Sequence, residues 1–417
     1  MGTSNILTFK LKQHTPFIHF QHVQDDASLR ATEIKPLLDK FLIKKNLLSV
    51  NGKVKKGKEP YFNDIQNLAL QYKLSFECTE KEEYIIASYI SKAKLAELNR
   101  TRVLHISGAP YFGDAKGLVW RNIVMSIKTL NKKVKDLFST DVLSEFFLLN
   151  NFGNRKSKGF GSFSVQGNEN SLASAHSVEN LFKENHIAVY KKEIEGPSDF
   201  TKIFSDINLS YQGLKSGYNL PGNYEKSDLF KYFSKPGRET GWEKRRIKIG
   251  IKNQAVFTEK IFAKKYEPID FDYKNDKVIY INTWKEVDNP KYRFVRALLG
   301  LAETNEYLID YNGEADRETK YVVEINSVDK SLERMASPLT FKVIGNTVYV
   351  LANRLPKKIF DSKFDFTLKI KRKVGEVWKT DRKEVSLISG LAVPSESDFD
   401  IVKFLDEYIV IKGYKKL

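Results

Sequence analysis

A fourteen-residue segment from Phe152 to Val165, FGNRKSKGFGSFSV, carries the sharpest chemical signal in the sequence. Its three glycines permit positive φ and close backbone approach, so backbone amides could point at phosphate oxygens. Three cations and a serine lie between the glycines, where a nucleic-acid backbone would run. The residues that we assign to this phosphate-binding loop are Gly153, Arg155, Lys156, Ser157, Lys158, Gly159 and Gly161.

The same segment also contains aromatic residues. Phe160 and Phe163 could stack on bases or simply pack against the protein, and of the two we assign Phe160 to RNA binding. The glycine spacing is neither that of a P-loop nor G-x-G-x-x-G, so the segment is not assigned to nucleotide binding. An ordinary bulged turn that leads into a strand remains the alternative.

Histidines suggest a second kind of chemistry. His14, His19 and His22 lie close together around Thr15-Pro16, and histidine is the commonest general acid–base residue. Their spacing is not a recognised metal signature, and histidines at alternating strand positions are usually packing or surface residues. We therefore predict no metal site and no catalytic residue.

Composition favours a polyanionic partner. The 417 residues carry 69 Lys and Arg against 52 Asp and Glu, a formal charge of +17. Such a field attracts nucleic acid, although it could also serve solubility alone. Cys78 is the only cysteine, which excludes an internal disulfide and suits a reducing cytoplasm. No apolar run is long enough to span a membrane, and no signal layout opens the chain.

The N-terminal half alternates strands and helices. Period-two alternation predicts a strand over residues 5–13, and an apolar stripe predicts a helix over 29–43, capped by Thr32. Strands are expected at 72–79, 82–90 and 101–108, then a long helix from Asp114 to Phe138, and a strand after Gly159. This is the βαββαβ order of a ferredoxin-like domain.

The C-terminal half predicts a similar order with insertions. Strands are expected at 186–196, 277–284, 321–328, a hairpin at 339–352 that turns at Gly345-Asn346, and 364–373. Helices are expected at 197–217, at 290–303 with its end at Gly300, and near the C-terminus. We predict an α+β protein with two ferredoxin-like domains, residues 1–167 and residues 168–417.

Five segments along the chain resemble one known superfamily. FGNRKSKGFGSFSV is similar to the glycine-rich loop of the RAMP superfamily, the RNA-binding proteins of CRISPR systems. LTFKLKQHTPFIHF with LRATEIKPLLDKFL resembles that family's first strand, Thr-Pro turn and first helix. Within this superfamily, one family comprises the first subunits of the Cmr complex, the type III-B CRISPR effector. The segments YRFVRALLGLAE and LERMASPLTFKV resemble the second domain of that family.

The resemblance implies two RAMP domains in a non-catalytic RNA-binding subunit of this effector. Such a subunit would bind crRNA and target RNA near the guide's 3′ end, help to capture target RNA, and contact other RAMP subunits. The guide supplies sequence specificity by pairing while protein holds the backbone. The resemblance implies no cofactor, and it adds three RNA-binding residues at the first helix: Arg30, Thr32 and Lys35.

Five further cations are assigned to RNA contact with less support. Lys116 and Arg121 open the long predicted helix, where a solvated face would explain them equally well. Arg293, Arg296 and Arg334 accompany the C-terminal motifs, where they could contact RNA, a neighbouring subunit or the protein itself.

The alternative function is a RAMP endoribonuclease. Processing enzymes of this family use a histidine, which here would be His19 or His22, and slicing subunits use an aspartate after the first strand, which here would be Asp26. Processing enzymes carry their glycine-rich loop near the C-terminus, whereas this loop lies mid-chain. A third possibility is a basic RNA-binding protein that belongs to no complex.

Overall fold

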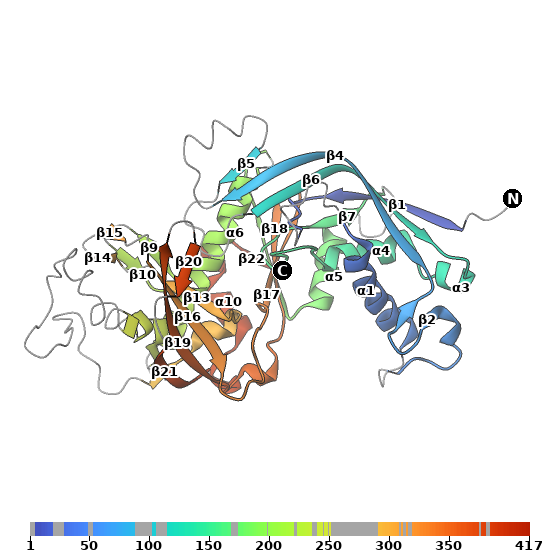
Figure 1. Cartoon of the computed structure of the whole chain (residues 1–417). Coiled ribbons are helices and arrows are strands. Elements are labelled where there is room, and N and C mark those ends of the chain that lie inside the picture. Colours follow the sequence, from blue (N-terminus) through green and yellow to red (C-terminus); the bar gives the residue numbers. More distant parts are fainter. Residues whose placement is uncertain are drawn as a thin grey trace, which may run out of the picture. The chain divides into compact units, whose positions relative to one another are not determined.

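The computed structural model describes most of the chain. The described residues are 5–19, 29–48, 53–87, 102–105, 115–167, 174–197, 199–220, 223–235, 240–244, 246–248, 250–251, 291–307, 310–311, 314–315, 319–374, 377–380 and 384–417. They form a mixed α/β structure in which nearly all strand pairs are antiparallel (Figure 1). Among these residues, no helix is both long and apolar enough to cross a membrane.

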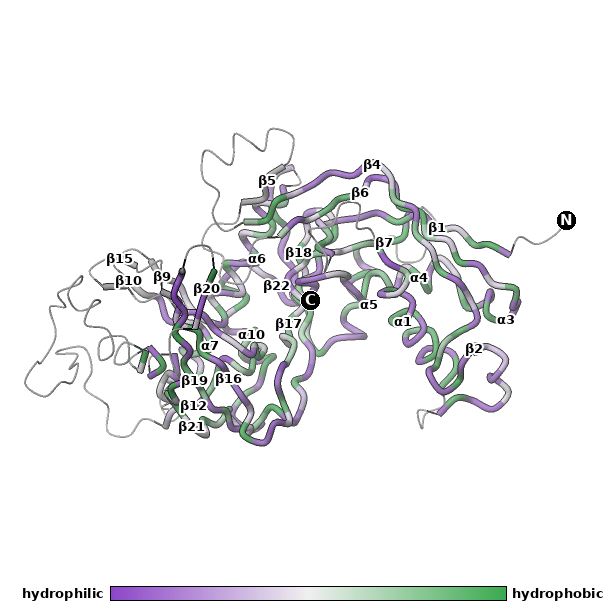
Figure 2. Tube along the Cα trace, in the orientation of Figure 1, coloured by the Kyte–Doolittle hydropathy of each residue, from purple (hydrophilic) through white to green (hydrophobic). Residues whose placement is uncertain are grey.

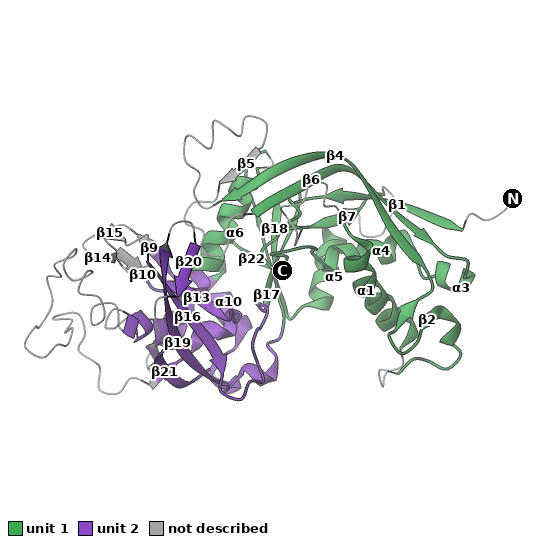
Figure 3. Cartoon of the chain, in the orientation of Figure 1, with its two compact units in different colours: residues 1–212, 339–353, 409–417 green, residues 213–338, 354–408 purple. Residues whose placement is uncertain are grey.

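The chain forms two compact units. Unit 1 comprises residues 1–212, 339–353 and 409–417, and unit 2 comprises residues 213–338 and 354–408 (Figure 3). These units are groups of residues that contact one another in space, and each is made of separate stretches of the chain. The predicted boundary after residue 167 instead divides the chain by the order of its strands and helices. The predicted boundary therefore stays a prediction.

The first sheet of unit 1 is built around the N-terminal strand. Its order is β5 (Arg102–His105), β4 (Lys73–Ala87), β6 (Ala115–Lys128), β1 (Ile6–Gln13) and β7 (Phe163–Val165). β1 pairs antiparallel with β6 and β7, and β4 pairs antiparallel with β6. With α1 (Ala31–Leu42) after β1 and α4 (Thr140–Leu149) before β7, the elements follow the order β1, α1, β4, β6, α4, β7.

Alternation in β1 places one face of this sheet in the core. Leu11 of β1, Ile123, Met125 and Ile127 of β6 and the apolar stripe of α1 belong to one buried cluster. α1 and α4 therefore cover one face of the sheet (Figure 1). α1 continues into a π-helix, Ile43–Leu47, and short elements follow: a 3-10 helix (Glu59–Tyr61), β2 (Phe62–Asp64), β3 (Ala69–Leu70) and, after β6, α3 (Lys132–Lys135).

The second sheet of unit 1 has four strands, and its first strand along the chain lies between the third and the fourth, as in the strands β4, β6, β1 and β7 of the first sheet. Its order is β17 (Leu339–Ile344), β18 (Thr347–Ala352), β8 (Ala188–Glu193) and β22 (Lys415–Lys416), all antiparallel. Along the chain these strands alternate with α6 (Phe200–Lys215) after β8 and α10 (Ile401–Tyr408) before β22. α5 (Ala175–Asn185) packs on this sheet through Val178, Leu181 and Phe182.

Unit 2 is centred on a further antiparallel sheet. It contains β13 (Thr304–Tyr307), β16 (Thr319–Ser327), β19 (Lys363–Val374), β20 (Val377–Thr380) and β21 (Val385–Ala392). Smaller elements of unit 2 are β9 (Tyr218–Leu220), β10 (Asn223–Glu225), α7 (Asp228–Phe233), β11 (Thr240–Trp242), β12 (Lys291–Arg293), β14 (Asp310–Tyr311), β15 (Glu314–Ala315) and 3-10 turns at Val295–Leu299, Lys357–Ile359 and Glu396–Asp398. A last 3-10 turn, Val410–Lys412, precedes β22 in unit 1.

The long helix predicted from Asp114 to Phe138 is wrong. Residues 115–128 form β6, and only Lys132–Lys135 is helical. Leu118, Ile123 and Ile127 fit a helical stripe, but the period-two burial of Ile123, Met125 and Ile127 shows that pairing with β1 and β4 decides the structure.

Smaller predictions had mixed outcomes. The hairpin at Gly345-Asn346 is confirmed, because Ile344 pairs with Thr347 and Gly345 has φ +59°. Thr32 is not the cap of α1, which begins after Arg30. The helix predicted at 290–303 is β12 followed by a 3-10 turn that ends at Gly300, and the strand predicted at 277–284 lies outside the described residues.

Candidate nucleic-acid interface

The glycine-rich loop is closed by a backbone hydrogen bond and is tightly packed. Phe152 N–H donates to the carbonyl of Gly161 at 2.9 Å, which closes the loop at its base. Gly153, Gly159 and Gly161 have φ of +78°, +86° and +65°. A Cβ at Gly161 would lie 1.9 Å from the carbonyl oxygen of Phe152. Glycine is therefore required here by close backbone packing.

The loop amides largely serve the protein itself. Gly153 N–H donates to Glu33 Oε1 at 2.7 Å, Asn154 N–H to the carbonyl of Ile18 at 2.7 Å, and Gly161 N–H to the carbonyl of Pro16 at 2.9 Å. The expectation that the amides of Gly153 and Gly161 face phosphate is wrong, because both amides donate inward. Any phosphate contact would therefore depend more on the loop's side chains.

Thr15 holds the far side of the loop. Its hydroxyl donates to the carbonyl of Gly159 at 2.7 Å and accepts from Ser162 N–H at 3.0 Å. Thr15 is fully buried. The Thr-Pro turn after β1 is thus a support for the loop, and this explains why the two sequence motifs occur together.

The aromatic residues of the loop belong to the core. Phe152, Phe160 and Phe163 are all 0% exposed. The ring of Phe160 stacks on Phe204 of α6, with centroids 3.9 Å apart and planes 13° apart. The suggestion that Phe160 contacts RNA is wrong, because its ring has no exposed face for a base, and the packing alternative holds.

The loop cations differ in exposure. Lys156 is exposed, whereas Arg155 at φ +57° and Ser157 are half-buried. The ammonium of Lys158 lies 2.7 Å from the ring centroid of Tyr211, so it is held against α6. Lys156 is therefore the loop cation best placed to meet a ligand, with Arg155 beside it.

The first turn of α1 lies against this loop. The hydrogen bond from Gly153 N–H to Glu33 joins them directly. Arg30 is the N-cap residue, half-buried and without a side-chain cap, and Thr32 is exposed. The positive end of the α1 dipole thus lies beside the loop, which favours a nearby anion.

Lys35 is directed into the protein. Its ammonium donates to Asp39 Oδ2 at 2.6 Å and to the carbonyl of Leu70 at 3.1 Å, and it lies 4.1 Å from the ring centroid of Tyr72. These contacts explain Lys35 as a structural residue that ties α1 to the segment before β4. An RNA contact would have to compete with them.

Lys116 and Arg121 lie on β6 and are paired with glutamates of β4. Lys116 Nζ is 3.0 Å from Glu83 Oε1, and Arg121 contacts Glu82 Oε1 at 2.6 Å. The Arg121 side chain is 63% exposed. An ion pair with so exposed a cation contributes little stability, so Arg121 could exchange Glu82 for a phosphate, whereas Lys116 and Glu83 are both half-buried.

The three C-terminal arginines lie in unit 2 and have different surroundings. Arg296 is buried, with Nε 2.6 Å from Glu243 Oε1 and Nη2 3.1 Å from the Tyr307 hydroxyl. The suggestion that Arg296 binds RNA is wrong, because this internal pair buries the guanidinium. Arg334 is exposed and pairs with Glu303 at 2.5 Å, and Arg293 is half-buried on β12.

His14 is a buried structural residue. It accepts a hydrogen bond from Gly345 N–H at Nδ1, so Nε2 carries the proton and donates to Ser164 Oγ at 2.9 Å. Burial, then the charges of Lys342 and Lys12, lower the pKa of His14 to about 3. This imidazole is therefore neutral at physiological pH.

Of the other residues that the nuclease alternative would use, the structure describes only His19. His19 is 2% exposed and lies near the ring of Phe17. His22, Asp25 and Asp26 lie outside the described residues. Within the described part of the chain, no group of three or more His, Cys, Asp or Glu side chains could hold a metal ion.

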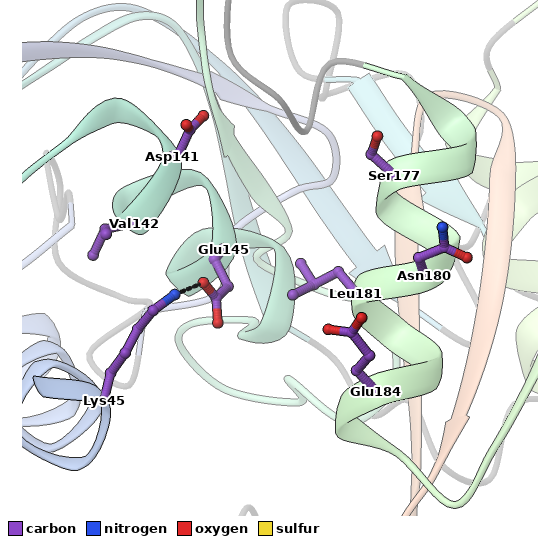
Figure 4. Close-up of a pocket in the computed structure, with 8 residues that line it drawn as sticks. All are labelled: Lys45, Asp141, Val142, Glu145, Ser177, Asn180, Leu181 and Glu184. Atoms are coloured by element: carbon purple, nitrogen blue, oxygen red, sulfur yellow. Dashed lines mark hydrogen bonds and ion pairs between the residues drawn. The ribbon is translucent and has the colours of Figure 1, made fainter.

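Two pockets adjoin α5 in unit 1. One, of about 490 Å³, lies between α4 and α5 (Figure 4). It carries Asp141, Glu145 and Glu184, and Lys45 reaches Glu145 across it. This acidic lining disfavours a phosphate. The other, of about 690 Å³, lies beside β7 and the β17–β18 hairpin and is lined by more mixed groups.

Two of the residues that shape the interface, Glu33 and Asn151, were not singled out from the sequence. Glu33 fixes the loop to α1, and buried Asn151 donates to the carbonyls of Lys156 and Phe341 at 2.7 and 2.8 Å. Lys342 of β17 donates to the carbonyls of Phe147 and Asn150. The contacts of Glu33 with Gly153 and of Asn151 with Phe341 are long-range, so no pattern of neighbouring residues could have suggested them.

Two family models together match most of the chain. A family model described as the Cmr1 N-terminal domain matches residues 4–218, and one described as the Cmr1 C-terminal domain matches residues 224–412. A crystal structure of Cmr1 from Pyrococcus furiosus in its apo form matches 99% of this chain and 98% of that chain, at 10% sequence identity and a TM-score of 0.31. No curated protein matches the sequence.

Proposed function

This chain belongs to the Cmr1 family, and we propose that it is a non-catalytic, RNA-binding subunit of the type III-B CRISPR effector, the Cmr complex. It holds the backbone of crRNA or target RNA near the guide's 3′ end and helps to capture target RNA. Its partners are these RNAs and other RAMP subunits, in the cytoplasm.

The observation that carries this proposal is the position of the loop against α1. The hydrogen bond between Gly153 and Glu33 holds the loop beside the first turn of α1, and Lys156 is exposed on that loop. A phosphate there would meet the positive end of the helix dipole, with Lys156, Arg155 and Arg30 as cations. Glu33 opposes it less than a free carboxylate would, because Glu33 already accepts the Gly153 amide.

The fold fits the same proposal. We propose two ferredoxin-like RAMP domains, residues 1–167 and 168–417, the second with long insertions. Both four-strand arrangements support this, since β4-β6-β1-β7 and β17-β18-β8-β22 each correspond to strand order 2-3-1-4 of a βαββαβ unit. The large insertions are the segments that form unit 2.

The subunit role can be tested in cells that express the complex. We expect an affinity-tagged full-length chain to co-purify with guide RNA and with other Cmr subunits. The purified chain, incubated with labelled guide precursor or target RNA with and without Mg²⁺, should cleave neither. Cleavage abolished by His22→Ala or Asp26→Ala would establish the nuclease alternative instead. RNA recovered without other subunits would indicate a stand-alone RNA-binding protein.

A further inference from the structure

The face of the first sheet opposite α1 and α4 is exposed and basic. In β1, Thr8, Lys10 and Lys12 are exposed and alternate with core residues. The register places Thr8 opposite Ser126 of β6 and, across β6, places Lys128 opposite Lys73 of β4. Paired residues share one face of a sheet, so these six residues form one surface, which we call the lysine face.

The lysine face carries an excess of positive charge. Lys10, Lys12, Lys73 and Lys128 are all exposed, and none forms an ion pair with a carboxylate of the described residues. Over residues 6–12 of β1, 73–79 of β4 and 122–128 of β6, the one carboxylate on this face is Glu77; further along β4 the same register adds Glu83. In Figure 2 the arc of β4 is mostly hydrophilic in colour. The surface therefore complements a polyanion.

The chemistry of this face favours RNA over a protein. Protein interfaces have an apolar or aromatic centre and are poor in lysine. Over residues 6–12 of β1, 73–79 of β4 and 122–128 of β6, the apolar members of the face are Val124 and Ile6, and the register places no aromatic residue there; the first one further along β6 is the buried Trp120. Serine and threonine hydroxyls between the lysines can donate to phosphate oxygens. Without aromatic rings to stack on bases, such contacts would be independent of sequence.

We propose that the lysine face is a second RNA-binding surface, which holds the phosphate backbone of single-stranded RNA without reading its bases. Lys10 and Lys12 lie two residues apart on one strand, about 7 Å, and can contact separate phosphates. The inference rests on the proposed RNA-binding function and adds a contact region other than the glycine-rich loop. It places RNA along β1, β6 and β4 in addition to the first turn of α1.

A matched pair of triple variants tests the lysine face. The full-length variant K10Q/K12Q/K128Q is compared with K40Q/K183Q/K202Q, which removes the same charge from exposed lysines of α1, α5 and α6. Binding of a fluorescein-labelled oligouridine is measured across a salt series. For the lysine-face variant we expect about tenfold weaker binding and a log-salt slope flatter by about 2, and for the control variant a nearly unchanged slope.

The outcomes separate this inference from the proposed function. If the wild-type chain binds RNA and both variants bind it more weakly by the same factor, the lysines of this face contribute only through the net charge of the protein. The inference then fails. If wild type binds no RNA, the proposed function fails with it. If the lysine-face variant binds RNA normally but loses a co-purifying subunit, the face serves an acidic protein and the inference is overturned. Unchanged unfolding midpoints confirm that both variants fold.

Discussion

Gly161→Ala should destabilise the protein by about 3 kcal/mol, because it combines two separate costs. The residue has φ +65°, a conformation unfavourable for a residue with a side chain. The new Cβ would also lie 1.9 Å from the carbonyl oxygen of Phe152, which is backbone and cannot rotate away. Relief requires opening the hydrogen bonds that close the loop. Chemical denaturation measures the loss as a lower unfolding midpoint.

Gly345→Ala is the matched control for this substitution. Gly345 also has positive φ, +59°, but an added Cβ there meets nothing within 4 Å. Only the conformational cost applies, about 1 kcal/mol. Equal losses for the two alanine variants would contradict the tightly packed loop that the structure shows. A loop that tolerates Gly161→Ala would also be too loose to position Lys156.

Lys342→Met should cost about 3 kcal/mol of stability, because it removes a buried cation that satisfies several carbonyls. The ammonium of Lys342 lies 2.7 Å from the carbonyl of Phe147, 2.8 Å from that of Asn150 and 3.5 Å from that of Phe163. The first two carbonyls end α4, where a cation also complements the helix dipole. Burial lowers the pKa of Lys342, which is the opposing cost.

Lys183→Met serves as the control, since Lys183 is exposed on α5 and the same substitution there should change stability by less than about 0.5 kcal/mol. Denaturant unfolding of both variants gives the comparison. A Lys342→Met protein as stable as wild type would mean that apolar packing can replace the ammonium. Lys342 would then not be what joins β17 of the second sheet to the end of α4.

The sequence predicted correctly those elements whose conformation is decided by residues close together in the chain. The alternation of β1, the stripe of α1 and the two-residue hairpin at Gly345-Asn346 each follow from neighbouring residues. β6 was misassigned because its apolar residues satisfy a helical period as well as a strand period. α5 was missed because a polar stretch precedes it, and its few apolar residues are buried only by packing on the second sheet.

The site shows the same limit. Composition identified the loop and its cations, but whether each glycine amide points outward depends on Glu33, Ile18 and Pro16, which lie far away in sequence. Likewise Arg296 is neutralised by Glu243, 53 residues away, and Lys158 is held by Tyr211. No pattern of neighbours could reveal these partners. The sequence therefore identified the loop and its cations but overcounted the groups that are available to a ligand there, and the contact of this loop with RNA stays a prediction.

The central claim is that this chain binds RNA through the glycine-rich loop, and equilibrium binding of a labelled single-stranded RNA tests it most directly. The wild-type chain should bind, with affinity that falls as salt rises. The variant R155Q/K156Q should bind more weakly, with a log-salt slope flatter by between about one and two, whereas K40Q/K183Q should keep the wild-type slope. A wild-type chain that binds no RNA at low salt, or a loop variant with an unchanged slope, would contradict the account.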